Sequence, residues 1–113
     1  MITKKKRKLR WRKLKKGIKG RLLAPLEKNT IKYIKENVEV FKAVIDSDFD
    51  GCAIEYEIYE AEYEDKDVIG IDFNILAKTV KEAEQYYKKF KYELKNHFGF
   101  KLNEHLKLKY DRI

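Results

Sequence analysis

Apolar residues occupy every second position in three stretches in the middle of the chain, residues 38–45, 52–63 and 69–75. A period of two places alternate side chains on opposite faces, as in a β-strand. The third stretch is the most regular, because polar or small residues separate its Ile and Phe residues. In the first stretch both sets are apolar, which predicts a strand covered on both faces. In the second the apolar phase shifts near Ile58–Tyr59, which predicts a bulge or a sharp twist.

Other stretches show the helical spacing of three and four. The longest runs over about residues 80–98, and its apolar positions are Val80, Ala83, Tyr87, Phe90 and Leu94. Thr79 and Glu82 form a capping box before it, and Gly99 is a typical residue to end it.

The two ends of the predicted domain give weaker signals. A short helix is predicted over about residues 25–36, because Pro25 suits the first turn of a helix. Asn29-Thr30 offers an alternative start. Residues 106–110 alternate again between apolar residues and Lys, which predicts a short last strand at an edge of the sheet.

Together these elements predict an α+β fold in the order α-β-β-β-α-β. We expect an antiparallel three-stranded β-meander, extended by the short C-terminal strand and packed against one or two helices. The order α-β-β-β-α is similar to that of double-stranded-RNA-binding domains, which carry a small-residue, Lys-rich motif at the start of their last helix. Residues 77–81 (Ala-Lys-Thr-Val-Lys) match that motif poorly, so the similarity implies an architecture and no site residues. At 113 residues, we expect a flexible basic N-terminal arm over residues 1–24 and a single domain over 25–113.

Charge divides the chain into segments of opposite sign. The net charge is +8 and the isoelectric point is about 9.4. Residues 1–35 hold fifteen Lys or Arg and one acid, Glu27, whereas residues 46–72 hold eleven carboxylates and one base, Lys66. So basic a balance indicates an anionic partner, which means nucleic acid, an acidic protein or an anionic membrane surface.

Nucleic acid, DNA or RNA, is the partner that the arm favours, because Lys and Arg neutralise phosphates and release their counterions. The candidate residues in the arm are Lys4, Lys5, Lys6, Arg7, Lys8, Arg10, Trp11, Arg12, Lys13, Lys15, Lys16, Lys19 and Arg21. Trp11 would stack on a base, or pack on the protein with Leu14, Ile18 and Leu22 if the arm becomes helical. A basic row on the last helix extends this surface through Lys81, Lys88, Lys91 and Lys95. A solubility tail and membrane-surface binding are the alternatives for the arm.

The acidic stretch matches the EF-hand calcium-loop pattern through Asp46, Asp48, Asp50, Gly51 and Glu57. An EF-hand needs a helix on both sides, and both flanks here have the period of a strand. We therefore interpret residues 46–51 as an acidic hairpin turn and expect no metal, with Asp46, Asp48, Asp50 and Glu57 as weak cation-site candidates.

No catalytic constellation is visible, so we expect no enzyme and no cofactor. His97 and His105 lack neighbours at metal-ligand spacing, and Cys52 is a single cysteine with no identifiable base. The chain shows no signal-peptide pattern and no apolar run of membrane-spanning length, which favours the cytoplasm.

Two alternatives to plain nucleic-acid binding follow from the charge division. The first is a protein inhibitor whose acidic sheet face, formed by Glu55, Glu57, Glu60 and Glu62, blocks a basic nucleic-acid groove of a partner. In outline such a chain resembles the small, charge-polarised phage and mobile-element inhibitors of CRISPR nucleases. The second is a factor associated with the ribosome or another ribonucleoprotein.

Overall fold

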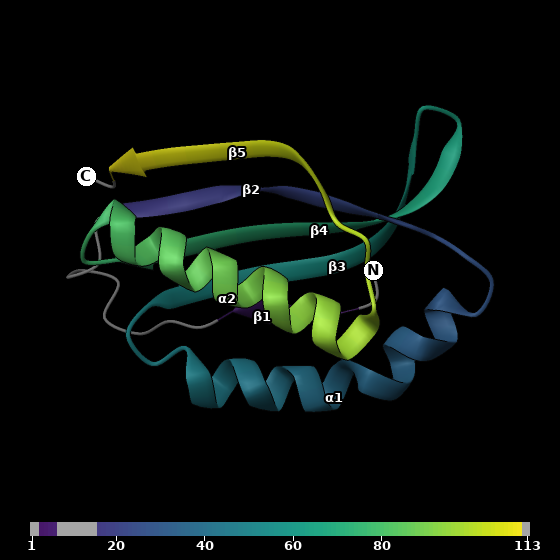
Figure 1. Ribbon diagram of the computed structural model, residues 1–113, viewed down its shortest axis with the longest axis horizontal. Helices are drawn as coiled ribbons and strands as arrows, with labels where there is room; N and C mark the ends of the chain where they lie inside the picture. Colours follow the sequence, from purple (N-terminus) through teal and green to yellow (C-terminus); the bar gives the residue numbers. More distant parts are fainter. Residues whose placement is uncertain (1–2, 7–15, 112–113) are drawn as a thin grey trace.

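The computed structural model describes residues 3–6 and 16–111 and shows one antiparallel sheet with two helices (Figure 1). The elements are β1 (Thr3–Lys6), β2 (Lys16–Pro25), α1 (Thr30–Asp48), β3 (Ala53–Tyr63), β4 (Lys66–Ala77), α2 (Val80–Phe98) and β5 (Asn103–Asp111). The predicted α+β class is confirmed, and so is a last strand at an edge of the sheet.

The strand order is β1-β3-β4-β2-β5, and every neighbouring pair is antiparallel. From β2 onward the elements run β-α-β-β-α-β, with β4 and β2 in the middle of the sheet. This is the ferredoxin-like, or split βαβ, arrangement. The predicted order α-β-β-β-α-β is corrected accordingly: three adjacent antiparallel strands are present as β3, β4 and β2, but the third comes from residues 16–25 and not from residues 38–45.

Strand β2 lies in the segment that we expected to be the last part of the arm. Ile18, Leu22 and Ala24 are buried, while Lys19 and Arg21 between them are exposed. Ile18 and Leu22 are four residues apart, and that spacing puts two side chains on one face of a helix and also on one face of a strand. The spacing alone therefore could not distinguish the two. Trp11 and Leu14, the other members of the predicted apolar face, lie outside the described residues.

Residues 38–45 belong to α1 and do not form a strand. The buried side chains of α1 are Ile34, Phe41 and Ile45, at helical steps of seven and four, and Val40 beside them is 55% exposed. A short run with apolar residues at odd and even positions fits a buried strand and a buried helix equally well. The helix begins after the N-cap residue Asn29, so the alternative start is confirmed, and Pro25 instead ends β2.

Strands β3 and β4 form the predicted hairpin. Glu64 and Asp65 connect them with φ angles of 50° and 62°, the two positive values of a type I′ turn. The register between the two strands is unbroken, so the bulge predicted near Ile58–Tyr59 is wrong. The phase of the apolar residues changes because Tyr59 packs on the opposite face of the sheet, where its ring covers Gly70.

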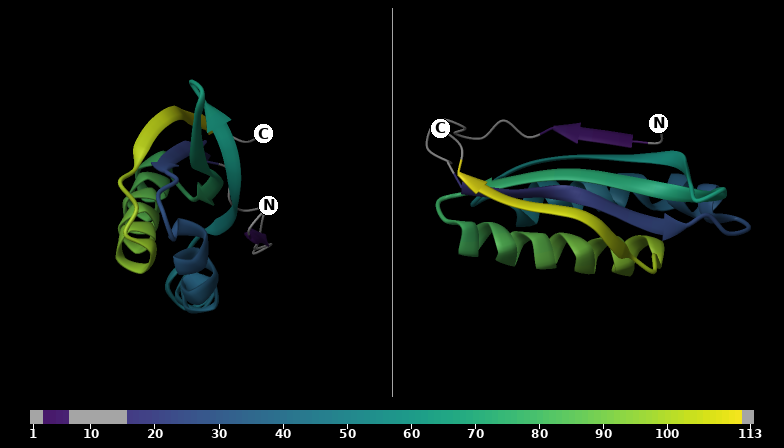
Figure 2. Two further views of the ribbon diagram at one scale, coloured as in Figure 1. Left: turned by 90° about the vertical axis from the view of Figure 1, so that its right-hand side faces the viewer. Right: turned by 90° about the horizontal axis from the view of Figure 1, so that it is seen from above.

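Both helices pack against one face of the sheet (Figures 1 and 2). An aromatic cluster fills the space between: the rings of Phe41 in α1 and Tyr56 in β3 meet edge to face at 5.4 Å, and Phe73 in β4 stacks on Tyr87 in α2 at 4.8 Å. The opposite surface, which we call the helix-free face, carries polar side chains of β2, β3 and β4. Neither α1 nor α2, the helices of the described region, has the length of apolar sequence that crosses a membrane.

Candidate nucleic-acid interface

The ends of α2 are fixed by the two signals found in the sequence. The Thr79 hydroxyl accepts a hydrogen bond from the Glu82 backbone N–H at 3.0 Å. Gly99 adopts a φ of 67°, and its N–H donates to the Lys95 carbonyl at 2.8 Å. Of the predicted apolar positions, Ala83, Tyr87, Phe90 and Leu94 are buried and Val80 is half-buried, which determines which residues point outward.

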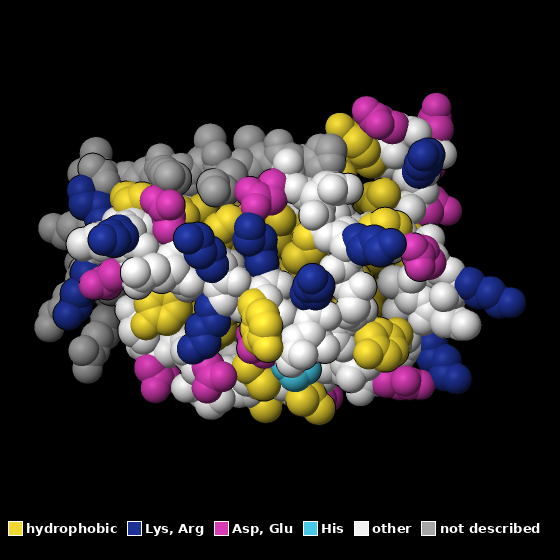
Figure 3. Space-filling model, in the orientation of Figure 1, with side chains coloured by type: hydrophobic (Ala, Val, Ile, Leu, Met, Phe, Trp, Pro, Cys, Tyr) yellow, Lys and Arg dark blue, Asp and Glu magenta, His cyan; other side chains and the backbone are white. Residues whose placement is uncertain are grey.

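The exposed side chains of α2 are mostly basic, and its carboxylates Glu82, Glu84 and Glu93 are half-buried. The exposed residues of this helix are Lys81, Gln85, Lys88, Lys89, Tyr92, Lys95 and Asn96. The exposed residues of α1 instead include two bases and four acids, namely Lys32, Lys35, Glu36, Glu39, Asp46 and Asp48. The positive charge of the helical layer is therefore concentrated on α2, and basic side chains are spread over the face that α2 presents in Figure 3.

Lys81, Lys88 and Lys95 form one row along α2. They are seven residues apart, which corresponds to a rise of about 10 Å between neighbours. None of the three has a side-chain hydrogen bond or ion pair with another described residue. We call these three lysines, together with Tyr92 on the same surface, the α2 basic face.

Lys91 and Lys89 have contacts of their own. The Lys91 Nζ lies 2.6 Å from Glu104 Oε1 at the start of β5 and 4.6 Å from the centre of the Tyr87 ring. The Lys89 Nζ donates to the Asp48 carbonyl at 2.8 Å. Lys91 was predicted as part of the row, but its contacts join α2 to β5. Lys89 joins α2 to the end of α1.

The structure separates the residues of the predicted arm. Lys4, Lys5 and Lys6 lie in β1 at the β3 edge of the sheet, where Lys4 is opposite Glu57 and Lys6 is opposite Glu55. The remaining candidates before β2 lie outside the described residues: Arg7, Lys8, Arg10, Trp11, Arg12, Lys13 and Lys15.

The candidates in β2 are not arranged as a track toward α2. Lys19 and Arg21 lie on the helix-free face, and Lys16 begins the strand. Arg21 forms a bidentate pair with Asp72, with Nε–Oδ1 at 2.8 Å and Nη2–Oδ2 at 3.3 Å, and the Tyr59 hydroxyl donates to the same Oδ1 at 2.8 Å. A phosphate that bound Arg21 would have to compete with this carboxylate, so Arg21 is a structural residue of the sheet.

The phenol of Tyr59 makes this network sensitive to alkaline pH. Burial and the hydrogen bond to Asp72 raise the pKa of Tyr59 from 10.0 to about 12. The folded state therefore favours the neutral phenol, and the stabilisation is present below pH 10 and is lost as the pH rises toward 12. Urea unfolding at about pH 9 and about pH 11.5 should show that Tyr59→Phe loses less stability over this interval than the unmodified chain.

Tyr63→Phe is the matched control, because Tyr63 lies on the same strand and is exposed. If both variants lost the same amount of stability between the two pH values, the role of Tyr59 would be contradicted. Both variants will still lose some stability between the two pH values, because burial also raises the pKa values of Tyr56, Tyr86 and Tyr87.

The four glutamates of the predicted acidic partner-binding face do not share a face. Successive residues of a strand point to opposite sides of the sheet. Glu55 and Glu57 lie on the helix-free face with Tyr59, whereas Glu60 and Glu62 lie on the side of the buried Ile58. The register with β1 also brings two lysines beside Glu55 and Glu57. The prediction of a single acidic surface formed by all four glutamates is therefore wrong.

The weak cation-site candidates are not gathered either. Asp46 and Asp48 lie in the last turn of α1, Asp50 follows that helix, and Glu57 is in the middle of β3. Among the described residues, no group of three or more His, Cys, Asp or Glu side chains has the arrangement of a metal site. Residues 46–51 connect a helix to a strand, so the interpretation as a hairpin turn is corrected.

His97 and Cys52 have structural contacts. His97 Nε2 lies 3.0 Å from Glu93 Oε2, and its ring meets Phe41 at 5.9 Å. The thiol of Cys52 is buried and donates to the Phe49 carbonyl at 3.6 Å. The side chain of His105 lies outside the described residues.

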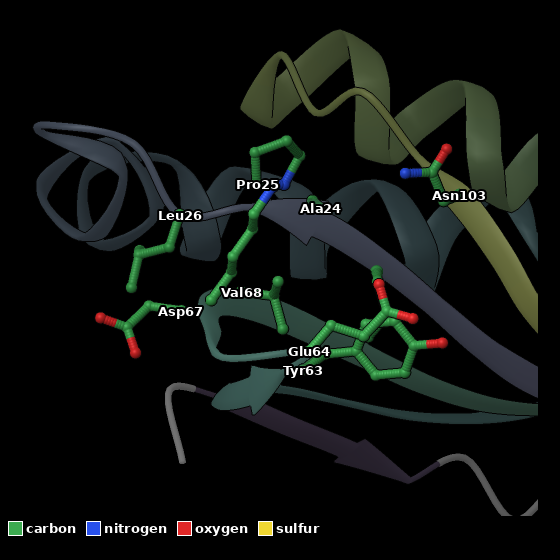
Figure 4. A pocket seen from close by; sticks show the side chains of 10 residues that line it. Ala24, Pro25, Leu26, Tyr63, Glu64, Asp67, Val68 and Asn103 are labelled. Atoms are coloured by element: carbon green, nitrogen blue, oxygen red, sulfur yellow. The ribbon is translucent and has the colours of Figure 1, made fainter.

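A hollow of about 750 Å³ lies where the β3–β4 hairpin meets the end of β2 and the start of β5 (Figure 4). Tyr63 and Asn103 line it, together with the acids Glu64 and Asp67 and a single base, Lys66. This charge balance does not suit a polyanion, so the hollow is a weaker candidate for phosphate binding than the α2 basic face.

Comparisons with protein-family models, curated proteins and solved structures find no match to this chain. The assignment of a site therefore rests on the arrangement of its own residues. Tyr92 is the residue that the sequence reasoning missed. The sequence could have placed it beside the lysine row, because Tyr92 lies four residues after Lys88 and three before Lys95. Such residues are neighbours on a helix surface.

Proposed function

We propose that this chain is a small, non-enzymatic nucleic-acid-binding protein that contacts phosphates through the α2 basic face. The observation that supports it is the charge of the exposed residues of α2, which include four lysines while its three glutamates are half-buried. The exposed residues of α1 beside it include more acids than bases. Neutralised phosphates release condensed counterions, and this term provides most of the affinity of non-specific nucleic-acid binding.

The arm residues that lie outside the described part stay predicted contributors to the same binding. Residues 7–15 hold six Lys or Arg, and the described residues on either side, Lys6 and Lys16, lie opposite Glu55 and Ala77. Ala77 comes three residues before α2 begins. Lys6 and Lys16 therefore lie at the end of the sheet at which α2 begins.

The test is the triple variant K81Q/K88Q/K95Q, measured by fluorescence anisotropy with a 20-nucleotide strand as the salt concentration is varied. If each lysine neutralises one phosphate, the log–log salt slope should become less steep by about 2 on a single strand. The affinity at about 0.1 M salt should fall on the order of 100-fold.

The matched control is K28Q/K32Q/K35Q, which removes the same charge from exposed positions on and just before α1. Its affinity and salt slope should change far less. An equal loss in the two variants would mean that only net charge matters, and no binding to DNA or RNA at 50 mM salt would disprove the proposal. Association with the ribosome or another ribonucleoprotein, which the basic arm would support, stays a prediction. So does a role as an inhibitor of a nucleic-acid-binding protein, and so does a location in the cytoplasm.

A further inference from the structure

Tyr92 is the most exposed large hydrophobic side chain of the described residues, at 64%. It lies in the second turn from the end of a helix whose other exposed residues are all basic or amide. Single exposed apolar side chains are common on protein surfaces, so what distinguishes Tyr92 is its position within a basic surface, where a ring can stack on a base.

Tyr87 on the same helix shows what a ring covered by the protein looks like. Tyr87 is 2% exposed, stacks on Phe73 and is covered by the Nζ of Lys91 at 4.6 Å. Tyr92 has no ring contact and no cation–π contact with any described residue. The ring of Tyr92 is therefore available, whereas that of Tyr87 is part of the core.

The two nearest lysines of the row lie on either side of Tyr92 along the helix. Lys88 is one turn before it and Lys95 is one turn after it. A nucleotide whose base is stacked on a ring has a phosphate on each side of its sugar. The spacing of the α2 basic face thus provides one stacking surface and a cation for the phosphate on each side.

We propose that the α2 basic face takes single-stranded nucleic acid, with one base stacked on Tyr92 and the adjacent phosphates at Lys88 and Lys95. This inference rests on the proposed function and names its ligand class. In a duplex the bases are stacked on one another and only their edges are accessible, so Tyr92 could not use its ring there. A membrane surface fits poorly, because the apolar side of α2 is buried against the sheet and cannot enter a bilayer.

The experiment uses the full chain and three probes: a 20-nucleotide oligothymidylate, a strand of the same length made of abasic sites, and a 20-base-pair duplex. Tyr92→Ala should weaken binding to oligothymidylate about 5- to 150-fold, since base–aromatic stacking is worth about 1–3 kcal/mol per base. It should leave binding to the abasic strand and the duplex unchanged. Tyr92→Phe should bind like the unmodified chain, because stacking needs the ring and not the hydroxyl.

Tyr33→Ala is the matched control, because Tyr33 is 46% exposed but lies on α1; it should not change any of the three affinities. If Tyr92→Ala leaves oligothymidylate binding intact while K81Q/K88Q/K95Q remains defective, the stacking inference fails and the proposed function stands. If Tyr92→Ala weakens all three probes equally, Tyr92 contributes without stacking and the inference fails as well. If the triple lysine variant also binds normally, the proposed function itself fails.

Discussion

A chain that lacks residues 1–24 is expected to lose its cooperative thermal transition, whereas one that lacks residues 1–15 is expected to keep it. The difference is β2, which lies between β4 and β5 and pairs with both. Its side chains Ile18, Leu22 and Leu23 are 0%, 0% and 6% exposed. Burial of each contributes about 1.5–3 kcal/mol, which together is a large part of the 5–15 kcal/mol that typically stabilises a domain.

Circular dichroism during heating measures this result for the two truncated chains side by side. Loss of residues 1–15 also removes β1, so that chain should melt below the unmodified protein but still in a single transition. A cooperative transition of normal amplitude in the chain without residues 1–24 would show that β2 is dispensable. The expected boundary of the arm at residue 24 would then be right after all.

Phe41→Ala is expected to destabilise the protein by about 3–5 kcal/mol, the usual cost of truncating a buried aromatic residue. Phe41 is 0% exposed and its ring contacts Tyr56, Phe90 and Phe98 at 5.0–6.1 Å between centroids. It therefore joins α1 to α2 and to the sheet. Equilibrium unfolding in urea, monitored by circular dichroism, measures the change in free energy.

Val40→Ala distinguishes α1 from the strand that the sequence predicted over residues 38–45. In the helix Val40 is 55% exposed, so its truncation should change stability by less than about 0.5 kcal/mol. In a strand covered on both faces, Val40 and Phe41 would be buried on opposite sides and both variants would be costly. A large loss in both would contradict the helix.

The elements that could be predicted are those whose local signals agree with their tertiary surroundings. In β4 a strict alternation coincides with one covered face, and in α2 the capping residues and the apolar spacing indicate the same limits. In β2 and α1 the apolar spacing is compatible with either type of element. The choice there depends on neighbours distant in sequence, since β2 is a strand through its pairing with β4 and β5.

The candidate site was predictable to the same extent. Lys81, Lys88 and Lys95 could be placed on one surface because the position of α2 was clear from the sequence. The role of Lys91 depends on Glu104, which is thirteen residues away on another element. The acidic face could not be assessed without the register, because Glu57 and Glu60 differ by an odd number of positions and so lie on opposite sides of the sheet.

The pairing of β2 with β5 has a consequence for how the chain folds. The hairpin of β3 and β4 closes a turn of two residues, whereas Leu23 and Asn103 meet across a loop of about eighty. From the length dependence of loop closure, bringing β5 to β2 costs about 3 kcal/mol more in chain entropy than closing the hairpin. Because contacts between distant segments slow folding, we expect the hairpin to form early and the docking of β5 to set the folding rate.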